Sequence, residues 1–162
     1  MKIKSLFASI FAPLVLLAAG CAWADAPFTV STDGQEVTDG KTGLIWRRCA
    51  EGMSATGGSC TGTASTFTHE SALVRARDQA ASTSVAWRLP NVKELASIAD
   101  RSKSNPAIDT AAFPATPANS FWSSSPHGGV ASLAWVVFFD FGFVGDGSRG
   151  NAFPVRLVRA GQ

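Results

Sequence analysis

Residues 134–139, Ala-Trp-Val-Val-Phe-Phe, constrain the fold more than any other segment, because every side chain in this run is apolar. Successive side chains of a β-strand point to opposite faces of the sheet. A strand of this composition therefore presents apolar groups on both faces, and each face must be covered by a core or by another element. The sequence predicts a sheet with further structure packed against it.

Two helices are expected before this sheet. Residues 68–82 have helical spacing, with Thr68 as N-cap and the apolar side formed by Ala72, Leu73, Ala76 and Ala80. In residues 87–100, Asn91 and Glu94 have the spacing of a capping box, which places Leu95 and Ile98 toward the core.

Strands are expected on either side of the helices. They comprise residues 28–31, 43–49, 120–125, a strand–turn–strand unit centred on Gly142 within 134–144, and a closing strand at 154–160. Trp46 is expected to anchor the core, and the Pro- and Ala-rich residues 101–120 to form an irregular connector. This order predicts an α+β fold with a mainly antiparallel sheet.

The first 24 residues are typical of a secretory signal peptide. Lys2 and Lys4 precede an apolar stretch too short to span a membrane, and residues 22–24, Ala-Trp-Ala, supply a cleavage site. We therefore expect a secreted or periplasmic protein whose single domain is residues 25–162. In the alternative, residues 17–21 form a lipobox, and Cys21 carries the lipid anchor of an outer-membrane lipoprotein.

The remaining cysteines, Cys49 and Cys60, predict one disulfide in an oxidising compartment, with zinc ligation the poorer interpretation. The chain has 14 basic and 12 acidic residues. Because Lys2 and Lys4 lie in the predicted signal peptide, the mature domain has 12 of each. This balance gives no support for nucleic-acid binding. No membrane span, cofactor or metal is expected.

Two motifs suggest chemistry that their context does not support. Residues 145–150 match G-x-G-x-x-G, but Pro154 follows and no helical period begins there, so we expect a glycine-rich surface loop. Residues 123–125 are three serines close to His127, but the chain has no G-x-S-x-G elbow and only two histidines. We therefore predict no catalytic residue.

Several motifs in order resemble the bacterial domain of unknown function named for the C-terminal domain of the Legionella collagen-like adhesin. They are "VTDGKTGLIWRRCAEG", "CTGTASTFTHESAL", "WRLPNVKEL", "PAIDTAAFP", "FWSSSP", "AWVVFF" and "VRLVR". The resemblance runs from about residue 28 to residue 159. It implies a C-type-lectin-like fold, with two helices packed on a twisted antiparallel sheet, and it implies binding rather than catalysis. Adhesin members are associated with sulfated glycans.

In folds of that kind, ligand contacts lie on the late strands and loops. The resemblance therefore implies a ligand-binding surface formed by His127, Asp140, Phe141, Phe143, Asp146, Ser148, Arg149 and Asn151. It implies a scaffold formed by Trp87, Leu89, Trp122, Trp135, Val155 and Leu157. The Glu-Pro-Asn and Trp-Asn-Asp signatures of calcium-dependent lectins are absent, so calcium-dependent sugar binding is not expected.

We therefore expect an exported, non-enzymatic binding or adhesion module that recognises a glycan or a surface protein through residues 127–151. The alternative is a structural envelope component or assembly partner, with the aromatic loop at a subunit interface.

Overall fold

The computed structural model describes residues 27–161. The predicted signal peptide and Cys21 lie outside the described residues. Within residues 27–161, no helix has the length and apolar character that a membrane crossing requires.

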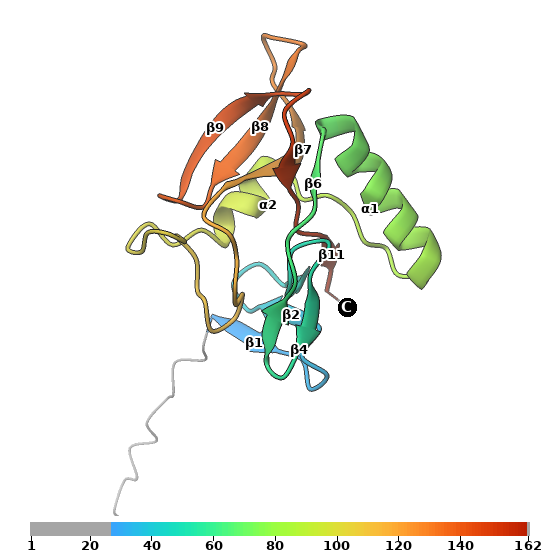
Figure 1. The fold of residues 1–162 in the computed structure, drawn as a ribbon, viewed down its shortest axis with the longest axis vertical. Coiled ribbons are helices and arrows are strands. Elements are labelled where there is room, and N and C mark those ends of the chain that lie inside the picture. Colours follow the sequence, from blue (N-terminus) through green and yellow to red (C-terminus); the bar gives the residue numbers. More distant parts are fainter. Residues whose placement is uncertain (1–26, 162) are drawn as a thin grey trace, which may run out of the picture.

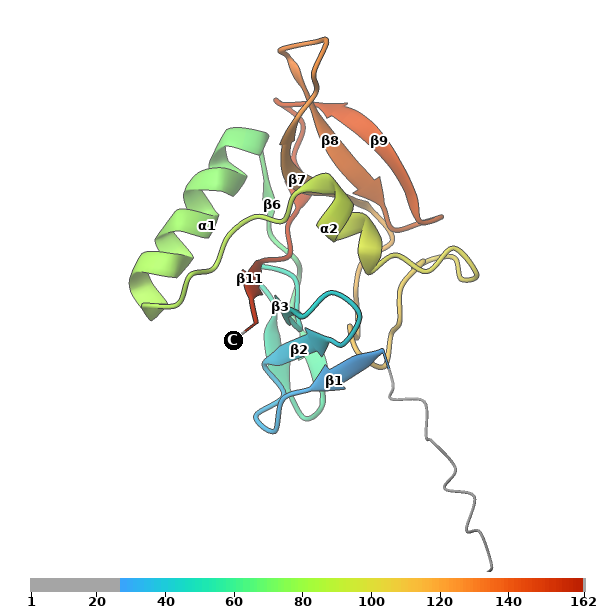
Figure 2. The same ribbon diagram turned by 180° about the vertical axis from the view of Figure 1, so that it is seen from behind.

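The fold is α+β, with two helices and mainly antiparallel strands, as predicted (Figures 1 and 2). A four-stranded sheet has the order β1-β2-β3-β11, and a three-stranded sheet has the order β7-β8-β9. The strands of the first are β1 Phe28–Val30, β2 Glu36–Asp39, β3 Leu44–Arg47 and β11 Val158–Ala160. Those of the second are β7 Ser120–Pro126, β8 Leu133–Phe138 and β9 Phe143–Ser148. Two short pairs join β4 Ser54–Thr56 with β5 Ser59–Thr61 and β6 Thr66–Phe67 with β10 Phe153–Pro154.

Both predicted helices form with the expected caps. The α1 helix is His69–Thr83, and the Thr68 side chain accepts a hydrogen bond from the backbone N–H of Ser71. The α2 helix is Val92–Ser97, and Asn91 and Glu94 form the complete capping box. These bonds satisfy backbone N–H groups that a helix end leaves without partners.

The apolar strand β8 is covered on both faces, as its composition predicts. Val137 packs in one core cluster with Leu95 of α2 and with Ile98, the C-cap residue of that helix. Val136, on the other face of the strand, packs in a second cluster that includes Ala76 of α1. The prediction that Leu73 belongs to the apolar core side of α1 is wrong, because 41% of its surface is exposed. Ala72 and Ala76 are the side chains of this stripe that are fully buried, since small residues let α1 approach the sheet closely.

The four-stranded sheet adds Trp46 and Val37, both fully buried, to the α2-side cluster. The predicted disulfide joins Cys49, just after β3, to Cys60 on β5. The closing strand is shorter than predicted: β11 begins at Val158, and Pro154 lies in the two-residue strand β10. Proline lacks the N–H that a continuous ladder would need at that position.

The largest buried polar group is Arg156, which is fully buried. Its guanidinium donates hydrogen bonds to the backbone carbonyl oxygens of Arg47 and Arg48 and to the Thr116 hydroxyl, and it lies 4.8 Å from the centroid of the Phe113 ring. Burial lowers the pKa of Arg156 to about 9. Carbonyl dipoles therefore stabilise this cation in place of a carboxylate, and they fix residues 47–48 to the C-terminal segment.

The prediction of a glycine-rich loop at 145–150 is wrong for residues 145–148, because they belong to strand β9, Phe143–Ser148. Gly145 and Gly147 are required by packing. A Cβ on Gly145 would collide with the Phe138 ring, and one on Gly147 would lie 2.9 Å from Cε2 of Phe153 and 3.2 Å from Trp122. The glycines therefore make room for aromatic rings beside the strand, and they do not mark a loop.

Candidate binding surface on the β8–β9 hairpin

The turn between β8 and β9 exposes two aromatic side chains. Phe141 and Phe143 keep 54% and 53% of their surface accessible to solvent, and Val144 keeps 40%. The turn itself depends on Gly142, which has φ +77° and whose missing side chain leaves room for Arg101 and Ala107. An L-residue at this position would be strained, so glycine is required here. We refer to residues 140–144 as the aromatic tip.

The aromatic tip is held in place from outside the hairpin. The Arg101 Nε donates a hydrogen bond of 3.1 Å to the carbonyl oxygen of Gly142, and its guanidinium lies 5.2 Å from the centroid of the Phe143 ring. The backbone N–H of Asn105 donates to the carbonyl oxygen of Asp140 at 2.9 Å. The Asp140 carboxylate accepts a hydrogen bond from the backbone N–H of Phe141 at 3.0 Å. The exposed rings therefore stand on a turn whose backbone is fixed.

The open end of the hairpin gathers other predicted residues around the β7–β8 loop. The Arg149 Nε and the backbone N–H of His127 both donate to the carbonyl oxygen of Leu133, at 3.2 Å each. Leu133 is the register partner of Ser148. The backbone N–H of Asn151 donates to the Ser148 carbonyl oxygen. His127, Ser148, Arg149 and Asn151 therefore lie close together, although 24 positions separate the first from the last in the sequence.

The prediction that Trp135 belongs to the buried scaffold is wrong. It is half-buried, and the His127 ring packs against it with centroids 4.9 Å apart and an interplanar angle of 32°. The His127 Nδ1 accepts hydrogen bonds from the backbone N–H groups of Gly129 and Val130. Asp146 pairs with Trp135 across the β8–β9 ladder and is exposed. Trp135 thus forms part of the outer surface beside the open end, because α2 covers the strand at Val137 but not along its whole length.

A depression of about 440 Å³ lies beside the open end, lined in part by Arg149, Gly150 and the first turn of α1. Its lining includes His69, which is 3% exposed and whose Nε2 lies 3.1 Å from the carbonyl oxygen of Ser123. A carbonyl accepts, so Nε2 carries the proton. Burial lowers the pKa of His69, the bond to Ser123 partly offsets this, and the positive charge of Arg149 lowers the pKa further. His69 is therefore a neutral group at neutral pH.

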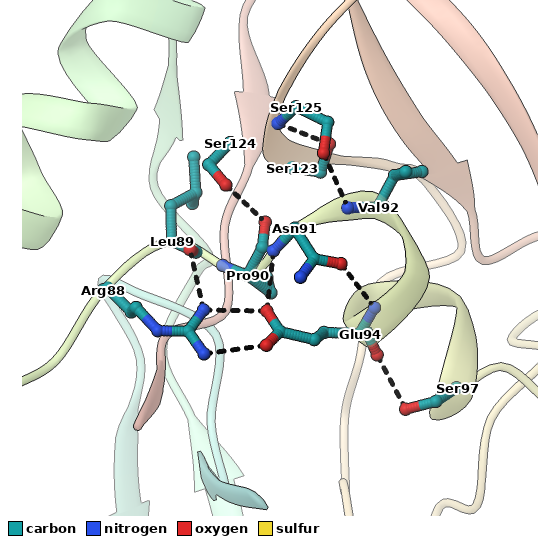
Figure 3. Close-up of polar contacts among 10 residues, drawn as sticks. All are labelled: Arg88, Leu89, Pro90, Asn91, Val92, Glu94, Ser97, Ser123, Ser124 and Ser125. Atoms are coloured by element: carbon teal, nitrogen blue, oxygen red, sulfur yellow. Dashed lines mark hydrogen bonds and ion pairs between the residues drawn. The ribbon is translucent and has the colours of Figure 1, made fainter. Parts of the chain in front are cut away.

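Two of the three serines at 123–125 connect β7 to the segment that begins α2 (Figure 3). The Ser124 hydroxyl donates to the carbonyl oxygen of Pro90, and the Ser125 hydroxyl accepts from the backbone N–H of Val92. The Ser123 hydroxyl donates to the carbonyl oxygen of Trp135. Each hydroxyl thus has a structural partner other than His127.

The family model described as Lcl C-terminal domain matches residues 35–159. The chain belongs to this family. The match contains both helices, the disulfide and the whole β8–β9 hairpin. No curated protein matches the chain.

In this member of the Lcl C-terminal domain family, the eight predicted binding residues form two groups. Asp140, Phe141 and Phe143 lie at the aromatic tip, and the other five lie toward the open end. The six residues of β8 separate the two ends, which corresponds to about 17 Å along a strand. A small ligand would contact one group, whereas a protein or a long glycan could contact both.

Sequence reasoning did not select Arg101, because its relation to the tip is a long-range contact with residues 142 and 143. It also gave no role to His69, because its position at the start of a helix does not show that it lines a depression together with Arg149, 80 positions later in the sequence. Within residues 27–161, no three His, Cys, Asp or Glu side chains come together in a way that would hold a metal ion.

Proposed function

We propose that this domain is an exported, non-enzymatic binding or adhesion module of C-type-lectin-like fold, and that it recognises its ligand through the β8–β9 hairpin. The observation that carries the proposal is the aromatic tip, where Phe141 and Phe143 are more than half exposed on a turn fixed by Arg101 and Asn105. Exposed apolar groups on rigid backbone are typical of interaction surfaces, since little ordering is required when the ligand arrives.

The chemistry of the tip favours a protein ligand over a glycan. Phenylalanine has no hydrogen-bonding group, and the neighbouring Val144 extends the apolar surface. Arg101, stacked on Phe143, adds a cation at its edge. Aromatic side chains with an adjacent arginine are enriched where protein interfaces bind most strongly. The open end, with Trp135, His127 and Asp146, offers polar groups that would suit an additional glycan contact.

The test is binding of the oxidised domain to immobilised envelope proteins, glycans and glycosaminoglycans, with calcium and with EDTA. We expect the variant Phe141→Ser/Phe143→Ser to lose binding by tenfold or more, which corresponds to about 1.4 kcal/mol or more. Val74→Ser is the control, because Val74 keeps 40% of its surface exposed on α1 and lies apart from both ends of the hairpin. Binding that survives the tip substitutions but is lost in Arg149→Ala would move the site to the open end.

A second candidate, assembly with other subunits, is favoured by the position of β9. In the described part of the chain, β9 pairs with β8 alone, so its other edge has no strand beside it. The aromatic tip continues directly into this edge. An open edge next to apolar side chains is a template for association with another chain. Sedimentation velocity at about 50 µM tests this candidate, since a monomer at that concentration would exclude a stable homodimer.

A further inference from the structure

A second polar pocket lies away from the hairpin, between α1 and the segment that follows β3. Its volume is about 270 Å³. Its lining includes two guanidinium groups, those of Arg47 and Arg75, the amides of Gln35 and Gln79, and the Ser54 hydroxyl. The disulfide cysteine Cys49 also lines the pocket, so covalent structure fixes one wall.

Arg47 has no polar partner for its side chain among residues 27–161. Its Nε is buried without a hydrogen bond, and the guanidinium makes no ion pair with any described residue. The neighbouring Arg48, in contrast, donates to the backbone carbonyl oxygens of Gly58, Ala111 and Ala112. Among the described residues, the Arg47 side chain therefore makes no hydrogen bond, whereas Arg48 uses its Nε and one terminal nitrogen. A buried donor without a partner costs free energy, and an acceptor on a ligand would recover it.

Two carboxylates close to Arg47, those of Glu36 and Glu51, already form ion pairs with other arginines. Glu36 is the register partner of Arg47 across β2 and β3, but its carboxylate bonds to Arg159 at 2.6 Å. Glu51, which is 7% exposed, bonds to the Nε of Arg75 at 2.8 Å. Counting Arg47, Arg75 and Glu51, the pocket lining has a net charge of one positive unit. That charge suits one monoanionic group.

The position of the Arg47 guanidinium is fixed by Trp87. Its Cζ lies over the Trp87 ring, 4.5 Å from the centroid. With one face of the guanidinium on the indole, its N–H groups remain available along the edge. A planar carboxylate can accept two parallel N–H bonds from such an edge and remain beside the ring. A dianion would carry one negative charge more than the lining offsets.

We propose that this pocket binds the carboxylate group of a small ligand or of a chain terminus, with Arg47 as the main donor and with Gln79 and the free nitrogens of Arg75 as its neighbours. The site is distinct from the β8–β9 hairpin, so it stands independently of the proposed function.

The experiment is an NMR titration of the mature, oxidised domain, following the arginine Nε–Hε and backbone amide resonances. The probes are acetate, glucuronate, and one short peptide with a free or an amidated C-terminus. Acetate should shift the Arg47 Nε–Hε resonance and amides near Gln79, with saturation at a Kd of about 10 mM. Arg47→Gln should abolish this saturable shift, and Arg47→Lys should weaken binding at least fivefold.

Arg77→Gln is the control, because Arg77 lies on α1, the helix that carries Gln79, and among residues 27–161 it forms an ion pair with the exposed Asp78 alone. It should leave the titration unchanged. If Arg47→Gln does not fold, Gln79→Ala provides the second variant and should weaken acetate binding. A response that is absent at Arg47, or that persists in folded Arg47→Gln, would overturn the site. Sulfate or phosphate binding as strongly as acetate would overturn its assignment to carboxylate. Stronger binding of the free-terminus peptide than of its amide or glucuronate would identify a chain terminus as the source.

Discussion

The phenyl ring of Phe138 on β8 occupies the space into which a side chain at Gly145 on β9 would project. The two residues are diagonal neighbours across the ladder. Gly145 pairs with Val136, which lies two positions before Phe138 on the same face of β8. An aromatic ring lying over a neighbouring glycine lets β9 pair closely while the ring stays half-buried. This contact determines how substitutions in β9 act.

Gly145→Ala should destabilise the domain by about 1–3 kcal/mol, because the added methyl group displaces the Phe138 ring or separates the strands. Gly150→Ala is the control, since a Cβ there meets nothing within 4 Å. Its effect should stay within about 0.5 kcal/mol. Urea unfolding of both variants measures the difference, and equal stabilities would contradict the packing role of Gly145.

Removing the disulfide with Cys49→Ala/Cys60→Ala should cost about 3 kcal/mol, because the bond closes a short loop in the unfolded chain. The two cysteines are separated by 11 positions. The same loss is expected when the unaltered domain is unfolded with a thiol reductant. A loss below about 1 kcal/mol in both experiments would show that β4 and β5 hold this loop without the covalent bond.

Stability should fall as the pH is lowered below the ordinary His69 pKa of 6.5. Burial lowers the pKa of His69 in the folded state, so below pH 6.5 the unfolded chain binds this proton first. The stability contributed by the neutral His69 side chain is therefore complete above pH 6.5. It is lost as the pH falls below 6.5 toward the lower pKa of the folded state. Denaturant unfolding between about pH 7.5 and 5 measures the slope of the free energy of unfolding against pH. His69→Gln should have a smaller slope over this range, and an unchanged slope would assign the effect to other groups.

Glu94→Gln should destabilise the domain by about 1 kcal/mol at neutral pH. Glu94 accepts two hydrogen bonds of 2.7 Å from Arg88 and one of 2.8 Å from the Asn91 backbone N–H (Figure 3). The Arg88 bonds are the main cause of its lowered pKa. The difference from the unaltered domain should therefore be complete above pH 4.5 and shrink as the pH falls below it.

Asp78→Asn is the comparison for Glu94→Gln, because Asp78 lies in an exposed ion pair with Arg77. Exposed pairs contribute little, so its effect should be close to zero at every pH. The free energies of unfolding of Glu94→Gln and of the unaltered domain should converge at low pH. If their difference instead stays constant down to about pH 3, the charge of Glu94 is not what stabilises the cap.

The sequence by itself determined the features that depend on local chemistry. Thr68, Asn91 and Glu94 cap their helices because capping needs only side chains and N–H groups three residues apart. The apolar run of β8 required cover on both faces, and Gly142 marked the turn, since each follows from backbone geometry. The two cysteines predicted the disulfide, since their spacing allows a short closed loop.

Tertiary structure decided the rest, because these features depend on neighbours distant in sequence. Gly145 and Gly147 suggested a loop, but the rings of Phe138, Phe153 and Trp122 make them strand residues. Trp135 is a large apolar residue typical of a core, yet it is half-buried and packs against the His127 ring on the outer surface. The predicted binding residues divide between two ends of one hairpin because a strand keeps them apart. Within residues 27–161, Arg47 lacks an ion-pair partner because the carboxylate of Glu36, its neighbour across the strands, bonds to Arg159, and charge pairing of this kind depends on three-dimensional proximity.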